Sequence, residues 1–145
     1  MRKLIYVVAI LIIVLAMIKG IDKGNIITET ENKYLVAGIE DSASFENTFK
    51  AIKEVIKEDN SEELEKYIIY PLIVHDNGKT IEIEDKEMFV NKYEEIVTNK
   101  IKESIINQKE EDLFVNYQGV MVGNGEVWLG ALEDQSKYGI IVINK

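Results

Sequence analysis

The chain has 145 residues, of which 46% are hydrophobic, and a formal net charge of −9; this length and composition predict one domain with its own hydrophobic core. All 26 acidic residues follow position 21, so residues 22–145 carry a net charge of 14 − 26 = −12, which argues against nucleic acid and anionic lipid as partners. Cysteine is absent, which excludes disulfides, a lipid-modified cysteine anchor and thiolate metal sites.

The first 20 residues differ from the rest of the chain. Arg2 and Lys3 are basic, and residues 4–18 form an unbroken apolar run. As a helix this run would be about 22 Å long, shorter than the ~30 Å hydrocarbon core of a bilayer, so both a cleaved signal peptide and an uncleaved membrane anchor remain open. Because the basic end stays in the cytoplasm, we expect residues 1–20 to export the chain. The rest is then either held at the cell membrane facing outward or secreted.

Residues 21–42 show no persistent hydrophobic period, and we interpret them as a tether. The domain that follows is predicted to cover residues 43–145. Its first element is an amphipathic helix, indicated by apolar residues at intervals of three and four: Phe45, Phe49, Ile52 and Ile56.

Three further elements follow in chain order. Asn60 and Glu63 form the capping box of a short helix. The turn Asp76–Lys79, with Asn-Gly at its centre, joins two β-prone runs into a hairpin. Asp85 then caps the third and longest predicted helix, which extends to about Gln108.

The last third of the chain has the residue pattern of β-strands. Its three runs, at residues 113–122, 126–132 and 138–143, are separated by polar or glycine-rich turns. This spacing predicts an antiparallel meander that follows the helices.

The order of these elements resembles the nuclear transport factor 2-like (SnoaL-like) superfamily over about residues 43–145. Three stretches carry the resemblance: Tyr70-Pro71-Leu72, Phe89 through Ile96, and Gly119 through Leu129. The resemblance implies an α+β fold in which helices pack on a curved antiparallel sheet to form a cone-shaped roll, preceded here by an N-terminal apolar helix. The superfamily includes isomerases, dehydratases and cyclases with Asp and His in the mouth of the cone, and members that only bind ligands or assemble. The fold alone therefore does not determine the activity.

His75 is the only histidine of the chain and the sharpest candidate for acid–base catalysis. Its neighbour Asp76 is a poor partner, because adjacent residues of a strand point to opposite faces; a carboxylate in the cone, such as Glu126, is the other candidate. We expect no metal site, because one histidine without cysteine leaves only carboxylates to complete it. No phosphate-binding loop or other cofactor motif is present, and we expect no cofactor.

A two-residue turn at Asn124-Gly125 would pair the strands on either side of it and sort their residues onto two faces, both apolar. The first face holds Tyr117, Met121, Trp128 and Glu126, and we expect the helices to cover it. These residues either line a ligand site, or the indole of Trp128 fills the space beneath the helices. We expect the second face to stay uncovered and to form a homodimer interface: Val120, Val122, Val127 and Leu129.

The leading functional hypothesis is a non-enzymatic, extracytoplasmic binding or assembly module, whose partner is a second copy or another protein of the cell envelope. Two alternatives stay open. One is a SnoaL-like lyase, isomerase or hydrolase that acts on a small molecule in the cone with His75 and Glu126. The other is an immunity or inhibitor protein whose acidic surface binds a basic protein. Contact with a membrane is expected only through the N-terminal segment.

Overall fold

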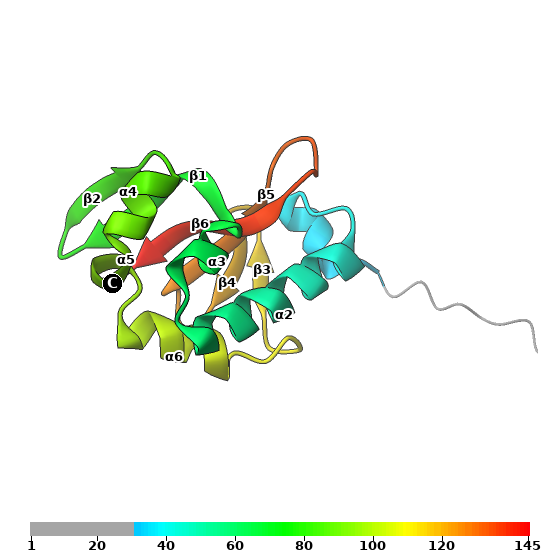
Figure 1. The fold of residues 1–145 in the computed structure, drawn as a ribbon. Helices are drawn as coiled ribbons and strands as arrows, with labels where there is room; N and C mark the ends of the chain where they lie inside the picture. Colours follow the sequence, from blue (N-terminus) through cyan, green and yellow to red (C-terminus); the bar gives the residue numbers. More distant parts are fainter. Residues whose placement is uncertain (1–30) are drawn as a thin grey trace, which may run out of the picture. The chain divides into compact units, whose positions relative to one another are not determined.

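The computed structural model describes residues 31–145 (Figure 1). Residues 32–145 form a compact unit with one hydrophobic core. The predicted signal peptide or membrane anchor at residues 1–20, and with it the N-terminal apolar helix, lies outside the described residues. Within residues 31–145 no helix is both long enough and apolar enough to cross a membrane.

The described residues form helices, then a β-hairpin, then three short helices and finally four strands. The helices are the 3-10 helix η1 (Lys33–Ala37), α2 (Ser42–Glu58), α3 (Ser61–Glu65), α4 (Lys86–Asn91), α5 (Tyr93–Ile96) and α6 (Asn99–Asn107). The strands are β1 (Ile68–Asp76), β2 (Lys79–Ile83), β3 (Phe114–Asn116), β4 (Gly119–Val122), β5 (Val127–Ala131) and β6 (Tyr138–Asn144). Helices α2, α3 and α4 each begin at a side chain that accepts a backbone N–H bond: Asp41, Asn60 and Asp85.

The strands form one mixed sheet in the order β2-β1-β6-β5-β4-β3. β1 pairs antiparallel with β2 but parallel with β6, whereas β3, β4, β5 and β6 pair antiparallel in sequence. The predicted α+β class is therefore confirmed, but the prediction of an antiparallel sheet is wrong for the β1–β6 pair. A parallel pair needs a long connection, because the chain must return to the same end of the sheet. Three helices and four strands supply that connection here.

The predicted strand at 113–122 is instead a hairpin, made of β3 and β4. Its turn lies at Tyr117 and Gln118, where the Gln118 N–H donates to Asn116 Oδ1 at 2.8 Å. Gly119 ends the turn with φ 140°, a conformation that residues with a Cβ rarely adopt. Beyond this turn the predicted pairing of β4 with β5 is confirmed, since Met121 lies opposite Trp128.

The single long helix predicted from Asp85 to about Gln108 is also wrong, because the chain forms α4, α5 and α6 instead. The breaks fall at Lys92 and at Val97–Thr98, whose backbone angles are not helical. A straight helix of this length would be about 35 Å long. Among the helices of residues 31–145 the longest is therefore α2.

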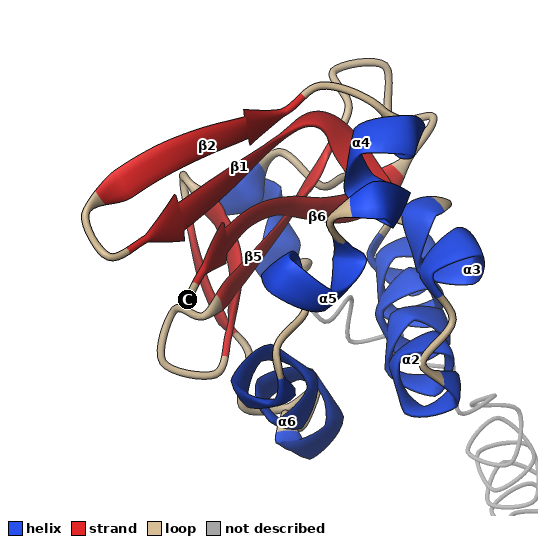
Figure 2. Cartoon of the chain, turned by 60° about the vertical axis from the view of Figure 1, so that its left-hand side comes forward, coloured by secondary structure: helices blue, strands red, loops and turns tan. Residues whose placement is uncertain are grey.

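The helices cover one face of the sheet, which we call the inner face; Figure 2 shows α2 and α3 on one side of the strands. The residues of β4 and β5 on this face belong to the same buried core as the apolar residues of α2 and α6. The prediction that these strand residues form an exposed dimer interface is wrong, because each is at most 1% exposed. These compact side chains belong to the buried core beneath the helices: Val120, Val122, Val127 and Leu129.

The segment before α2 is part of the folded domain. Tyr34, in η1, is 2% exposed and its ring lies 4.7 Å from the ring of Phe45, measured between centroids. Ile39 is fully buried in the same core. The predicted tether therefore extends too far, since the folded domain includes residues from Asn32 onward rather than from 43.

The packing of η1 against the core can be tested by replacing a buried and an exposed residue of this helix. We expect Tyr34→Ala to lower the free energy of unfolding by about 3–5 kcal/mol, because it removes a buried aromatic ring and leaves a cavity. Leu35→Ala is the matched control: Leu35 is 55% exposed, so its loss should cost within about 0.5 kcal/mol. Chemical denaturation of the full chain measures both, and equal effects would show that η1 is not part of the core.

A polar cluster ties the end of α2 to α5 and α6. Asp59 follows α2 in the left-handed conformation (φ 54°), and its Oδ1 accepts bonds from Lys102 Nζ at 2.6 Å and Tyr93 Oη at 2.8 Å. The bonds from Lys102 and Tyr93 hold the pKa of Asp59 below its ordinary value. The ionised form of Asp59 thus stabilises the junction of three helices.

The lowered pKa of Asp59 predicts an acid-dependent contribution to stability. A carboxyl whose pKa is lower in the folded state stabilises the fold above its unfolded pKa, about 3.9, and this contribution is lost as the pH falls through the folded pKa. We expect Asp59→Asn, which keeps a residue that tolerates the left-handed conformation, to melt below wild type at pH 7. The difference should shrink as the pH falls below the unfolded pKa of about 3.9. A difference that is as large in acid as at pH 7 would contradict this role.

Candidate functional site

A row of side chains crosses the uncovered face of the sheet, which we call the outer face. The register of the strands aligns one residue from each strand along this row: Phe114, Met121, Trp128, Val142, Ile73 and Glu82. The first five are apolar, and we refer to them as the outer row. Neighbouring strands are about 4.8 Å apart, so the outer row is about 20 Å long.

A β-bulge in β6 adds another apolar residue to this face. The register between β5 and β6 shifts after Trp128, which leaves Ile141 without a partner on β5. Ile141 and Val142 consequently both point to the outer face, although they are adjacent in sequence. The side chain of Ile141 lies over Gly130, where a Cβ would be only 3.0 Å from Ile141 Cδ1.

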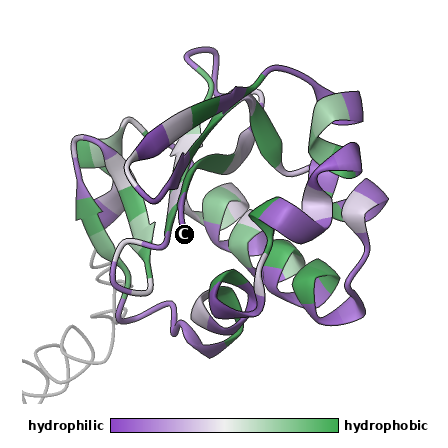
Figure 3. Cartoon of the chain, turned by 90° about the vertical axis from the view of Figure 1, so that its left-hand side faces the viewer, coloured by the Kyte–Doolittle hydropathy of each residue, from purple (hydrophilic) through white to green (hydrophobic). Residues whose placement is uncertain are grey.

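The outer row is not part of the hydrophobic core. In the described part of the chain, none of its five residues belongs to the core cluster or packs against it. Phe114 is 53% exposed, and the other four are partly exposed. Figure 3 shows hydrophobic residues along the strands as well as on the helices. A contiguous apolar strip of this kind on a soluble surface typically marks a binding site.

A hollow of about 310 Å³ lies beside Trp128 on this face. It includes three of the four residues predicted to bind a ligand: Met121, Trp128 and Glu126. The fourth, Tyr117, lies in the β3–β4 turn, is 82% exposed and does not line the hollow. The remaining lining is polar and comes from the β4–β5 turn, α6 and the end of β6: Lys100, Asn124, Gly125, Asn144 and Lys145.

The hollow lies on the face opposite to the one that we expected. The helix-covered inner face carries the valines and leucine of β4 and β5 instead of Met121 and Trp128. Trp128 is therefore not a plug of the main core.

Glu126 holds the β4–β5 turn together. Its Oε2 accepts a bond from the Asn124 N–H, and its Oε1 lies 3.6 Å from Lys100 Nζ. Gly123 has φ 66°, and a Cβ there would collide with Glu126 Oε2. Burial acts to raise the pKa of Glu126, but the N–H groups of Asn124 and of Glu126 itself, together with Lys100, outweigh it and hold this pKa below its ordinary value. Glu126 is thus an ionised structural residue.

The two candidate catalytic residues do not come together. His75 is exposed, and its Nδ1 lies 3.0 Å from Thr80 Oγ1. Asn144 of β6 lies between them, because it pairs with His75 on one side and donates its N–H to the Glu126 carbonyl on the other. Two steps across a sheet separate residues by about 10 Å. Asp76, the other candidate partner, pairs with Lys145 instead.

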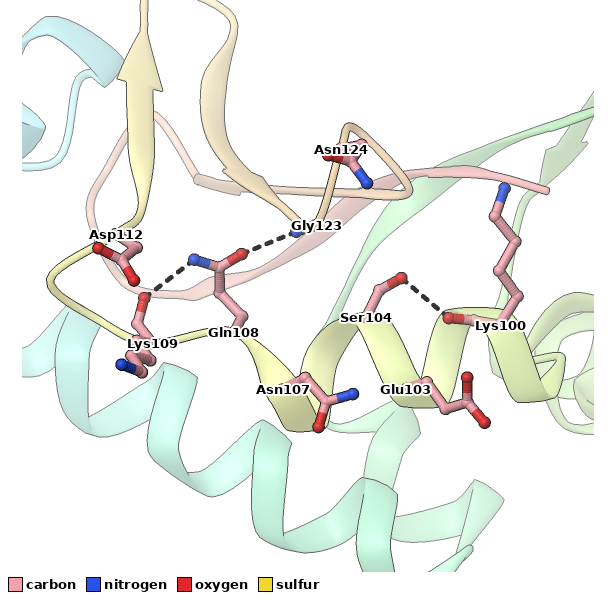
Figure 4. Close-up of a pocket in the computed structure, with 9 residues that line it drawn as sticks. All are labelled: Lys100, Glu103, Ser104, Asn107, Gln108, Lys109, Asp112, Gly123 and Asn124. Carbon is pink, nitrogen blue, oxygen red and sulfur yellow. Dashed lines mark hydrogen bonds between the residues drawn. The ribbon is translucent and has the colours of Figure 1, made fainter.

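A second hollow is a polar groove of about 530 Å³ between α6 and the β4–β5 turn (Figure 4). Gln108 crosses it, accepting a bond from the Gly123 N–H and donating to the Lys109 carbonyl. Ser104 donates to the Lys100 carbonyl within α6. The bonds of Gln108 lie within the protein and position the β4–β5 turn against the end of α6.

Comparison of the chain with known proteins does not indicate a function for this site. Neither a family model, nor a curated protein, nor a solved structure matches the chain significantly. Among residues 31–145, no group of three or more His, Asp and Glu side chains is placed to hold a metal ion.

The structural role of Glu126 can be tested with two substitutions. We expect Glu126→Ala to reduce the free energy of unfolding by about 1–3 kcal/mol, because the side chain is only 12% exposed and its loss leaves the Asn124 N–H without its acceptor. Glu126→Gln keeps an acceptor oxygen and should lose less. Glu103→Ala, an exposed residue of α6, is the control and should change stability by about 0.5 kcal/mol or less. A loss for Glu126→Ala no larger than that of the control would contradict the structural role.

Proposed function

We propose that this protein is a non-enzymatic binding or assembly module that acts outside the cytoplasmic membrane, to which residues 1–20 direct it. The observation that carries the proposal is the outer row, an apolar strip that crosses five strands and that no described element covers. Burying such a strip against a partner removes apolar surface from water, the main driving force of protein association.

The proposal includes membership of the nuclear transport factor 2-like superfamily, with a cone-shaped roll. Its support is the order of elements, in which helices, a hairpin, more helices and a strand meander follow one another as the resemblance implies. The short η1 and the division of the third helix into α4, α5 and α6 are departures from the simplest form of that pattern.

An enzymatic reading has less support. His75 is hydrogen-bonded to Thr80, and Glu126 to the β4–β5 turn, so neither has the other as an acid–base partner. An inhibitor of a basic protein would use the acidic surface. The acidic runs lie on the helices α3 and α5 and in the loop after α6 rather than beside the outer row: Glu62, Glu63, Glu94, Glu95, Glu110 and Glu111. Neither alternative explains why the outer row is apolar.

A photo-crosslinking experiment tests the proposal in the cell envelope. A photoreactive amino acid replaces Met121 in the full chain, on β4, the second of the five strands that bear the outer row. The matched control has the same group at Asn47, an exposed residue of α2. We expect a protein adduct from position 121 and none from position 47, because only the first faces a binding surface.

A second substitution shows whether the adduct depends on the row. Trp128→Lys places a charge beside Met121, where its desolvation would oppose binding, and should abolish the adduct while circular dichroism confirms that the chain is folded. Equal labelling from positions 121 and 47, or no adduct from either, would contradict the proposed binding surface.

A further inference from the structure

We propose that the hollow beside Trp128 is a binding site for a neutral sugar ring, either free or as one unit of a saccharide chain. The inference goes beyond the proposed function, which concerns the protein partner of the outer row. It follows from three features of the hollow: an aromatic and thioether wall, a rim of polar groups without partners, and a balance of charge. The hollow lies on the outer face, opposite to the helices, and is therefore separate from a cone beneath them.

One wall of the hollow is apolar. Trp128 and Met121 lie opposite each other on β5 and β4, and both are partly exposed. Gly125 lies beside them, and a Cβ at this position would be 3.8 Å from Met121 Sδ and 3.9 Å from Trp128 Nε1. Because glycine has no side chain, the thioether and the N–H edge of the indole are both open to a ligand at this point.

The rim of the hollow carries polar groups that have no partner within residues 31–145. Asn144 Nδ2 donates to the Gly125 carbonyl, and the Asn124 N–H donates to Glu126 Oε2. These internal bonds leave three groups free for a ligand: the indole N–H of Trp128, the side-chain amide of Asn124 and Asn144 Oδ1. The indole N–H donates, the amide both donates and accepts, and the oxygen accepts.

The charges around the hollow cancel. Lys100 Nζ lies 3.6 Å from Glu126 Oε1, and Lys145 Nζ lies 2.8 Å from Asp76 Oδ2. Each ammonium group that borders the hollow thus has a carboxylate beside it, although the chain as a whole has a net charge of −9. A charged ligand would compete with one of these partners, whereas an uncharged ligand leaves both pairs intact.

A sugar ring has the chemistry that this hollow offers. One face of a pyranose presents C–H groups that pack against an aromatic face, and its edge presents hydroxyls that both donate and accept hydrogen bonds. The indole of Trp128 likewise combines an apolar face with one polar group. A purely apolar ligand would leave the polar groups of Asn124 and Asn144 without partners, and a polyol without a ring would not cover the indole.

The size of the hollow fits one ring. Its volume of about 310 Å³ is at the lower end of the range for small-molecule sites, ~300–1,000 Å³. Because the hollow opens to solvent on the outer face, further units of a saccharide chain can extend away from it. Polysaccharides are common outside the cytoplasmic membrane, where the proposed function places this protein.

The sugar site and the protein-binding surface share only part of the outer row. Met121 and Trp128 belong to both. Phe114, Val142 and Ile73 do not line the hollow, and they stay available to a protein when a sugar ring is bound. The two sites can therefore be tested independently of each other.

Titration followed by NMR tests the sugar site directly. Trp128 is the only tryptophan, so the isotope-labelled full chain gives a single indole N–H signal. The chain is held in dodecylphosphocholine, a detergent without a sugar headgroup, and is titrated with cellotriose, with triacetylchitotriose and with sorbitol. We expect the indole signal to shift and saturate with at least one of the two cyclic sugars, and to stay unchanged with sorbitol, which has hydroxyls but no ring.

Matched substitutions separate the contributions to binding. Trp128→Phe keeps an aromatic face but removes the N–H donor, and Asn124→Ala removes the amide of the rim; each should weaken binding several-fold, and Trp128→Ala should abolish it. Glu103→Ala, on an exposed residue of α6 that does not line the hollow, is the control and should bind like wild type. The backbone N–H signal of Gly125 reports binding in every variant, and circular dichroism confirms that each is folded.

Three results would overturn the inference. The absence of a saturable shift with both cyclic sugars would show that the hollow is not a sugar site. Equal binding by Trp128→Ala and wild type would place the ring elsewhere. Glucuronic acid that binds several-fold more tightly than glucose would show that Lys100 and Lys145 select an anion instead. A protein adduct from position 121 that persists in any of these cases would leave the proposed binding surface standing without the sugar site.

Discussion

The pairing of β6 with two neighbours holds this fold together. β6 lies between β1 and β5, and backbone bonds at its two ends connect it to both sides, from the Ile140 N–H to the Tyr67 carbonyl and from the Asn144 N–H to the Glu126 carbonyl. Without β6, the hairpin β1–β2 and the strands β3–β5 would be separate ribbons, and small ribbons of this kind are marginally stable alone. The inner core and the outer row both extend across the sheet only because β6 joins these two parts.

The same strand decides which side chains are available for binding. Its bulge turns Ile141 and Val142 to one face while Ile140 and Ile143 are buried on the other. Four branched residues thus pack on the two sides of a single strand, and the space for Ile141 exists because Gly130 has no side chain. The two faces are then distinguished by size: compact branched residues lie under the helices, whereas the bulkiest side chains of β3, β4 and β5 lie outside.

The local features of the fold could be predicted from the sequence. The α2 stripe, the Asn60 cap, the Asn77-Gly78 hairpin and the pairing of Met121 with Trp128 all depend on residues close in sequence. The parallel pairing of β1 with β6 could not, because it joins residues about 70 positions apart and no local pattern records it. The sequence does not predict the short η1 for a similar reason. The burial of Tyr34 depends on its contact with Phe45 of α2, and no pattern within residues 33–37 records that contact.

The candidate site was only partly predictable. The sequence predicted that Met121, Trp128 and Glu126 lie together, and all three line the same hollow. Because both faces of β4 and β5 are apolar, however, the residue pattern does not indicate which face the helices cover. An unbroken strand from 113 to 122 puts Phe114 and Met121 on opposite faces, because seven residues separate them. The hairpin at Tyr117 places them side by side, and the signal for it was the Asn-Tyr-Gln-Gly sequence, which favours a turn.

The central position of β6 in the sheet has a consequence for the export that we propose for this chain. A polypeptide that is threaded through an export channel with its N-terminus first delivers β6 after every other element. Until then the strand that joins β1 to β5 is missing, and the sheet cannot close over the core. Contacts between residues far apart in sequence also form slowly. On the proposed export, this topology would therefore keep the domain unfolded during translocation, and the sheet would be completed only when β6 arrives on the far side.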